Sequence, residues 1–138
     1  MEDRYLYKAK TTPKEKGEFN NVWVTGNLIV SNGKYYIHPV GNVVNVKNEL
    51  GRIIVMHEVI PDTICQCTGL KDMNGKLIWE NDIVWDSDER AFYEIIWNQE
   101  DMCWNVEDAD GHKSEFEECY VSTIEVNGNI FDDLELLK

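Results

Sequence analysis

Long apolar segments are absent from this sequence, which argues against a helical membrane protein. No uninterrupted hydrophobic run approaches the roughly 20 residues that a helix needs to cross a bilayer. The opening residues also lack the apolar stretch of a secretory signal peptide. We therefore expect a cytoplasmic protein. In that reducing compartment, four cysteines are expected to be thiols and not disulfides: Cys65, Cys67, Cys103 and Cys119.

Recognisable metal and catalytic motifs are missing as well. Cys65 and Cys67 are too close for a structural zinc knuckle, and His38, His57 and His112 are scattered along the chain. The sequence holds no Gly-x-Ser-x-Gly elbow, no phosphate-binding loop and no calcium-binding loop. We therefore predict no catalytic, cofactor-binding or metal-binding residues, and no enzymatic activity.

Basic residues are scarce in the second part of the chain. The net charge is −13, and its distribution is uneven. Residues 1–61 hold 6 acids and 8 bases, whereas residues 62–138 hold 20 acids and 5 bases. Such an acidic segment repels phosphate backbones, so direct nucleic-acid binding by the second part is disfavoured.

Helical periodicity is weak, and turn signals take its place. Asn-Gly or Asp-Gly pairs suit tight β-hairpins because both residues accept a positive φ. They occur at Asn32-Gly33, Asn74-Gly75, Asp110-Gly111 and Asn127-Gly128. Segments rich in β-branched and aromatic residues flank them: 22–30, 34–38, 66–71, 76–79, 92–97, 102–106 and 119–126.

These short segments predict a mainly β protein. Their spacing is typical of a small barrel or sandwich, and we interpret residues 66–131 as a barrel-like unit. Residues 132–138 predict one helical turn that carries Leu134 and Leu137 inward. The change in charge and Pro61 place a domain boundary between residues 61 and 62, which leaves a smaller β-rich region at 1–61.

One segment has a specific sequence pattern. Residues 68–84 read TGLKDMNGKLIWENDIV, which resembles the hallmark TGLKDKNGKxIxEGDIV of the YopX-like family of phage and prophage proteins. Residues 23–28, 36–39, 58–63 and 126–137 resemble further parts of the family pattern, in the expected order. The resemblance implies a phage-derived protein whose C-terminal part is an SH3-like β-barrel, and it implies no particular activity.

The hallmark segment also has a plain physical interpretation. Asn74-Gly75 forms a tight corner, and Leu70, Ile78 and Ile83 are expected to face a common core. Asp82 is expected to accept a hydrogen bond from the backbone of its own turn. Asn81 stands where the family usually has glycine, and asparagine tolerates the left-handed region that such a turn requires.

Tryptophans beside acidic residues supply the candidate binding site. Trp85 and Trp97 lie at the ends of expected strands, where an aromatic group on an acidic rim can anchor a protein partner. Residues 86–118 hold 12 acids and 2 bases, Arg90 and Lys113. The predicted protein-binding residues are Trp85, Asp86, Trp97, Asp110, Glu117 and Glu118.

The leading hypothesis is a phage accessory protein, without enzymatic activity, whose acidic face binds a basic surface of a host or phage protein. A DNA mimic that inhibits a host nucleic-acid-binding protein is an alternative. An enzyme with a carboxylate-based site is a further one, although no motif with a required geometry supports it. A structural role as a homo-oligomer is another alternative, because the edge strands of small barrels readily pair.

Overall fold

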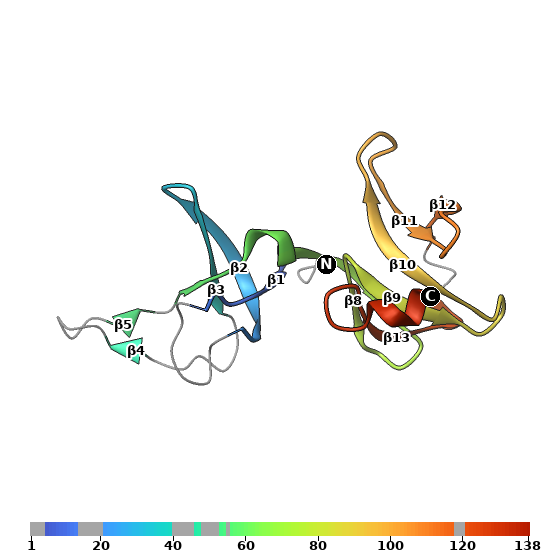
Figure 1. The fold of residues 1–138 in the computed structure, drawn as a ribbon, viewed down its shortest axis with the longest axis horizontal. Helices are drawn as coiled ribbons and strands as arrows, with labels where there is room; N and C mark the ends of the chain where they lie inside the picture. Colours follow the sequence, from blue (N-terminus) through green and yellow to red (C-terminus); the bar gives the residue numbers. More distant parts are fainter. Residues whose placement is uncertain (1–4, 14–20, 40–45, 48–52, 55, 118–120) are drawn as a thin grey trace. The chain divides into compact units, whose positions relative to one another are not determined.

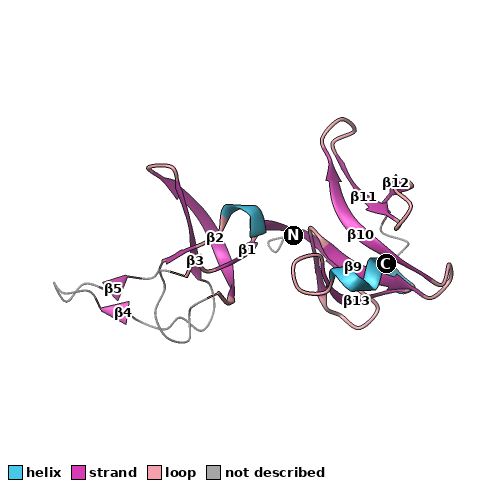
Figure 2. Ribbon diagram, in the orientation of Figure 1, coloured by secondary structure: helices cyan, strands magenta, loops and turns pink. Residues whose placement is uncertain are grey.

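A computed structural model describes residues 5–13, 21–39, 46–47, 53–54, 56–117 and 121–138. The described chain is mainly β, as the sequence predicts, and its strands are antiparallel (Figure 2). It divides into a first unit, Tyr5–Gln66, and a second unit, Cys67–Lys138. The described residues contain no helix long and apolar enough to span a membrane.

The first unit is built on a meander of β-strands. It contains β1 (Tyr7–Lys10), β2 (Trp23–Ser31), β3 (Lys34–Pro39) and β6 (His57–Glu58), which pair in the order β6-β3-β2-β1 (Figure 1). A separate two-stranded ribbon joins β4 (Val46–Lys47) to β5 (Ile53–Ile54), and a 3-10 turn, η3, covers Pro61–Thr63. The buried core of the first unit consists of Ala9, Ile37 and Val59.

The strand β7 (Cys65–Lys71) carries the chain from one unit to the next. Its first residues pair with β1, and its later residues pair with β8 (Leu77–Trp79). The sequence places the boundary slightly earlier, before Asp62, because the charge balance changes there. The compact units divide inside β7 itself, between Gln66 and Cys67.

The second unit holds the larger sheet. Its strands are β9 (Asp82–Asp86), β10 (Ala91–Asn98), β11 (Cys103–Glu107), β12 (Lys113–Glu115) and β13 (Ile124–Asn129), in the order β12-β11-β10-β9-β13. The first half of β10 pairs with β9 and its second half with β11. The β10–β11 hairpin therefore extends past the end of β9, as Figure 1 shows in yellow and orange.

The expected barrel is not closed by this sheet. In the described residues, β12 and β13 lie at opposite edges and no ladder joins them. The strand pairing shows an open antiparallel sheet, against which the β7–β8 hairpin supplies Ile78 to the core. A backbone hydrogen bond links the β7–β8 turn to β13, from the Met73 N–H to the Ile124 carbonyl oxygen at 3.1 Å.

The core of the second unit lies on one face of this sheet. It consists of Ile78, Val84, Ile95, Phe116 and Ile124, with Leu70 packed against it. Leu70 and Ile78 thus share a core as predicted, but Ile83 does not join them. Side chains alternate along β9, so the buried Ile83 points to the opposite face from Val84.

Three of the four predicted corners join strands. Asn32 and Gly33 both have positive φ, 53° and 74°, and connect β2 to β3 directly. The pairs at 74–75 and 110–111 lie in longer turns, where only the glycine has a positive φ. Asn81 also adopts the left-handed region expected of it, with φ of 69°.

The prediction of a hairpin at Asn127-Gly128 is wrong. These residues lie inside β13, where the register shifts between Val126 and Gly128 in a β-bulge. A Cβ atom on Gly128 would collide with the Asp133 carboxylate, so glycine here permits a close approach. The same dipeptide therefore serves two different purposes, a turn and a bulge.

The predicted C-terminal turn is present with a different inward face. Residues Leu134–Leu137 form a 3-10 helix, η5, after Asp133, whose side chain makes no capping hydrogen bond. Leu134 is exposed, whereas Leu136 and Leu137 line a hollow beside Phe92 of β10. Leu137 is thus partly buried as expected, and Leu136 takes the inward place expected of Leu134.

Asp72 fastens the β7–β8 hairpin to β13. Its Oδ1 accepts the N–H groups of Asn74 and Lys76, both at 2.9 Å. Its Oδ2 accepts the N–H of Val126, 54 residues away, at 2.8 Å. Burial raises the pKa of Asp72, but these N–H donors and the Lys76 ammonium outweigh it and hold the pKa below its ordinary value.

A nearly identical turn begins at Asp108 and provides an internal comparison. Asp108 Oδ1 accepts the N–H groups of Asp110 and His112, both at 2.9 Å. The backbone bonds also correspond, from Gly75 to Asp72 and from Gly111 to Asp108. The difference is the long-range bond to Val126, which the structure records for Asp72.

We predict that Asp72→Asn destabilises the protein more than Asp108→Asn. An amide presents one accepting oxygen where Asp72 uses two, so a buried N–H loses its acceptor, at a cost of about 1–3 kcal/mol. Urea unfolding at neutral pH measures the difference. Because the pKa of Asp72 is lower in the folded state, its stabilisation should hold above the ordinary Asp pKa and fade as the pH falls through the folded value.

Equal losses for the two variants at neutral pH would contradict this role of the Val126 bond.

In the first unit, Gly26→Ala should weaken the β2–β3 pair strongly. A Cβ atom there would overlap the His38 carbonyl oxygen across the ladder. Gly33→Ala is the matched control, because its Cβ would meet open space and only the positive φ opposes it, at about 1–2 kcal/mol. Hydrogen exchange of the β2 and β3 amides should rise more in Gly26→Ala, and the reverse order would refute the packing argument.

Candidate functional site

The two predicted aromatic anchors lie on opposite faces of the second unit's sheet. Trp85 pairs with Phe92 on the face away from the core, with ring centroids 4.8 Å apart at 60°. Trp97 pairs with Trp104 on the core face, 5.1 Å apart at 72°. Phe92 and Trp97 are an odd number of positions apart on β10, so their side chains point to opposite sides.

Trp97 is the more accessible of the two. Its side chain is 37% exposed, and its indole N–H donates to the Gln99 side chain at 2.9 Å. Met102, 65% exposed, lies in the same β10–β11 loop as Glu100 and Asp101. The end of this hairpin therefore joins apolar groups to an acidic rim, as the sequence predicts for Trp97.

Asp86 is buried, and it organises the β9–β10 turn. Its Oδ1 accepts the N–H of Asp88 at 3.0 Å and that of Glu89 at 3.5 Å. The Arg90 N–H bonds to the Asp86 carbonyl oxygen at 2.7 Å, and Arg90 has a positive φ of 55°. Within the described chain, Asp86 Oδ2 has no hydrogen-bond partner.

A cavity opens beside this turn on the core face. Its volume is about 210 Å³. The apolar walls come from β9, β11, β13 and the segment after β12: Val84, Val106, Ile124 and Phe116. Asp86, Glu89, Tyr93 and Ser114 supply its polar groups.

The remaining predicted residues are separate from this cavity. Asp110 is exposed in the β11–β12 turn, and Glu117 is exposed two residues after β12. Glu118 lies outside the described residues. The structure thus puts Asp86 in the cavity, Trp97 at the hairpin end and Asp110 in a third place.

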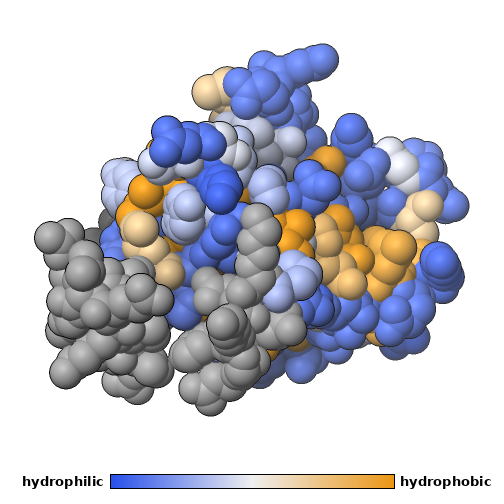
Figure 3. Space-filling view, turned by 60° about the vertical axis from the view of Figure 1, so that its left-hand side comes forward, coloured by the Kyte–Doolittle hydropathy of each residue, from blue (hydrophilic) through white to orange (hydrophobic). Residues whose placement is uncertain are grey.

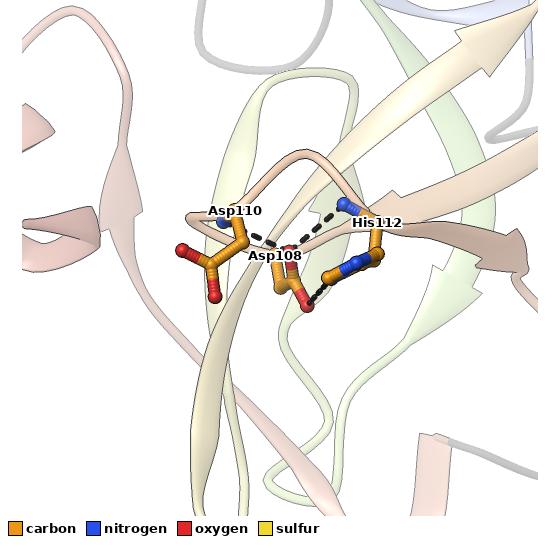
Figure 4. A group of neighbouring side chains, drawn as sticks. All are labelled: Asp108, Asp110 and His112. Atoms are coloured by element: carbon orange, nitrogen blue, oxygen red, sulfur yellow. Dashed lines mark hydrogen bonds and ion pairs between the residues drawn. The ribbon is translucent and has the colours of Figure 1, made fainter.

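Asp110 belongs to a group of potential cation ligands. Ligand atoms of Asp108, Asp110 and His112 lie within 4.8 Å of one another (Figure 4). The His112 Nδ1 atom is 3.2 Å from Asp108 Oδ2. The His112 backbone N–H lowers the pKa of Asp108, burial raises it, and the Asp110 N–H and the His112 imidazole lower it further, so that the net shift is downward.

A shallow hollow adjoins this turn on the sheet face away from the core. Ala91 and Phe92 of β10 line it together with Ala109, Leu136 and Leu137, and its charged groups are Asp108, Asp110 and Lys138. The hollow thus joins apolar groups to both acidic and basic ones. The coloured surface in Figure 3 is largely hydrophilic, with apolar groups showing between the polar ones.

A glutamate pair forms a feature that the sequence analysis missed. Glu94 of β10 lies directly opposite Glu107 of β11. Burial raises the pKa of Glu94, and the charges of Glu107 and Glu80 raise it further. The sequence held a signal for this pair. Asn98 pairs with Cys103 at the end of the hairpin, and Glu94 and Glu107 each lie four residues further along their strands, so the antiparallel register places them opposite each other.

Comparison with known protein families places the hallmark segment in a wider match. The YopX protein family matches residues 3–138. The chain belongs to this family. No curated protein matches it.

Glu94→Gln should stabilise the protein at neutral pH. The pKa of Glu94 is raised in the folded state, so ionisation costs the folded chain more than the unfolded one. The gain should be about 0.2–1 kcal/mol, the range of cross-strand pairs, and should vanish below the ordinary Glu pKa. Thermal melts at neutral and acidic pH measure it.

Glu100→Gln removes an exposed acid from the β10–β11 loop and serves as the control. An equal gain in this variant would mean that net charge, and not the Glu94–Glu107 pair, causes the effect.

Proposed function

We propose that this YopX family protein is a binding module that associates with a basic protein surface through its second unit. The observation that carries the proposal is the imbalance of exposed charge. In the described part of 86–118, exposed acids outnumber the exposed bases Arg90 and Lys113. These acids are Asp88, Glu89, Glu100, Asp101, Asp110, Glu115 and Glu117.

The positions of these acids suit long-range attraction. They lie in the β9–β10 turn, in the β10–β11 loop, in the β11–β12 turn and along the β12 edge. Charges at such solvated positions raise association rates more than affinity. Their effect falls with salt, because the Debye length is about 8 Å at physiological ionic strength.

Apolar groups at the end of the β10–β11 hairpin supply contact area. Trp97 and Met102 are exposed there beside Glu100 and Asp101. Aromatic residues and methionine are enriched in interface cores, with polar groups around them. We therefore propose that the exposed acids attract the partner during encounter, and that Trp97 and Met102 at this hairpin end hold it in the complex.

A non-enzymatic role is part of the proposal, and the use of the buried carboxylates supports it. Asp72, Asp82 and Asp86 each accept backbone N–H groups at a turn. A carboxylate engaged in this way serves the fold, and its oxygens are less available as a general base. The acids that remain at the surface are solvated, where their charges act at a distance.

Phage origin, cytoplasmic location and a relation to SH3-like barrels, which the family resemblance implies, are part of the same proposal. We infer a phage accessory protein in the host cytoplasm whose second unit is related to SH3-like barrels. The strand order β13-β9-β10-β11 supports this relation, as does the bridge from Asp72 to Val126. That bridge brings the end of β7 to β13, where a closed barrel would have a ladder.

The proposal predicts that basic proteins are captured from a host lysate at low salt and released at physiological salt. The variant Glu100→Lys/Asp101→Lys should lose most of this capture, because it reverses the charge at the anchoring hairpin end. Asp62→Lys is the matched control, since Asp62 is an exposed acid in the first unit. Mass spectrometry of the eluates measures recovery.

Capture that is insensitive to salt, or lost equally in Asp62→Lys, would refute the proposal. The same experiment distinguishes DNA mimicry: a mimic's partner would be displaced by duplex DNA, because mimic and DNA then occupy one site. Self-association would appear as capture of the untagged chain.

A further inference from the structure

We propose that the cavity beside the β9–β10 turn binds the cationic side chain of a lysine or arginine. This inference deepens the proposed function and rests on it, because the side chain would come from the basic partner. It names the place on the second unit where one partner residue is held.

The walls fit the aliphatic part of such a side chain. Val84 and Ile124 are almost fully buried, and Phe116 is 8% exposed. Lysine and arginine bury their methylene stems along apolar surfaces while the charged head stays with polar groups. The floor of the cavity therefore offers the stem a dry contact.

The polar groups of the cavity fit the charged head. Asp86 and Glu89 line it together, and no lysine, arginine or histidine lines it among the described residues. Because both ionisable groups are acids, the cavity favours a positively charged guest over a neutral or negative one. The Ser114 hydroxyl adds a neutral hydrogen-bonding group to the same space.

Asp86 has one oxygen that can accept a hydrogen bond from a guest. The residue is only 5% exposed. Its Oδ1 is occupied by the backbone of the β9–β10 turn, whereas Oδ2 has no partner within the described chain. A cationic head that enters the cavity would therefore find Oδ2 as its acceptor.

The size of the cavity restricts the guest. Its volume of about 210 Å³ lies below the roughly 300 Å³ at which pockets begin to hold drug-sized ligands. One long side chain matches this space better than a cofactor does. An ammonium or guanidinium group would also form charge-assisted hydrogen bonds with Asp86 and Glu89.

Small amides test the inference without the unknown partner. We would titrate the full chain with N-acetyl-lysine amide, N-acetyl-arginine amide and the neutral N-acetyl-norleucine amide, and follow backbone amides by NMR. The cationic probes should shift the signals of Asp88, Glu89 and Ser114, with Kd on the order of 1 mM or weaker. Norleucine, which has the stem without the charge, should leave these signals in place.

Variants separate a local site from general attraction. Glu89→Lys should weaken binding of the cationic probes about threefold to tenfold, because it puts a cation at the cavity. Glu135→Lys changes the net charge equally in the C-terminal 3-10 turn, outside the acids assigned to partner binding, and should keep nearly full affinity. Glu89 is exposed and its side chain makes no bond within the described structure, so folding should survive the change.

Three results would overturn the inference: no shift with either cationic probe, equal binding of norleucine, or an equal loss in Glu135→Lys. These outcomes are distinguishable from failure of the proposed function. If Glu89→Lys still captures basic proteins in a salt-dependent way, the binding module stands and the cavity assignment falls. If the probes bind while no partner is captured, the cavity stands alone.

Discussion

The carboxylate of Asp72 is the contact on which the second unit depends most. One oxygen closes the turn between β7 and β8, and the other holds Val126 of β13. A hairpin cannot bury its apolar face alone, so β7 and β8 need this attachment to bring Ile78 into the shared core. The hallmark segment contains Asp72 for a structural reason that the local turn does not reveal.

A comparison of the two Asp turns shows what the attachment adds. At Asp108 the same pattern of backbone bonds forms in an exposed hairpin. There the second oxygen faces the His112 ring, 3.2 Å away. At Asp72 the corresponding oxygen reaches a strand that is distant in the sequence. One local motif thus serves a surface turn in one place and a tertiary contact in another.

Local patterns in the sequence were sufficient for most strands and for the direct hairpin at 32–33. They were not sufficient where contacts between distant residues determine the structure. The Asn127-Gly128 pair looks like a corner, but the approach of Asp133 and the pairing with β9 make it a bulge. Ile83 looks like a core residue, and it is buried, but alternation along β9 directs it to the other face.

The candidate site shows the same limit. The residue types were predictable, because tryptophans and acids are visible in the sequence. Their grouping was not, since the faces of Trp85 and Trp97 depend on register. The cavity combines residues from β9 to β13 with Glu89 of the β9–β10 turn and Phe116 after β12, and only the fold brings these together.

The acids of the second unit divide by burial into two kinds with different physical effects. Buried carboxylates such as Asp72 and Asp82 accept hydrogen bonds from backbone N–H groups. These bonds compensate the desolvation of the carboxylates, and their charge therefore stabilises the fold. Exposed ones such as Glu100 and Asp101 keep their hydration and contribute a field that decays over a Debye length.

Asp86 stands between these two kinds. One of its oxygens belongs to the turn, and the carboxylate also lines a cavity shared with Glu89. A field alone attracts any cation, whereas a cavity of fixed size and apolar walls selects among them. Under the proposed function, the exposed acids would attract basic surfaces in general, and the size and apolar walls of the cavity would limit which side chains enter it.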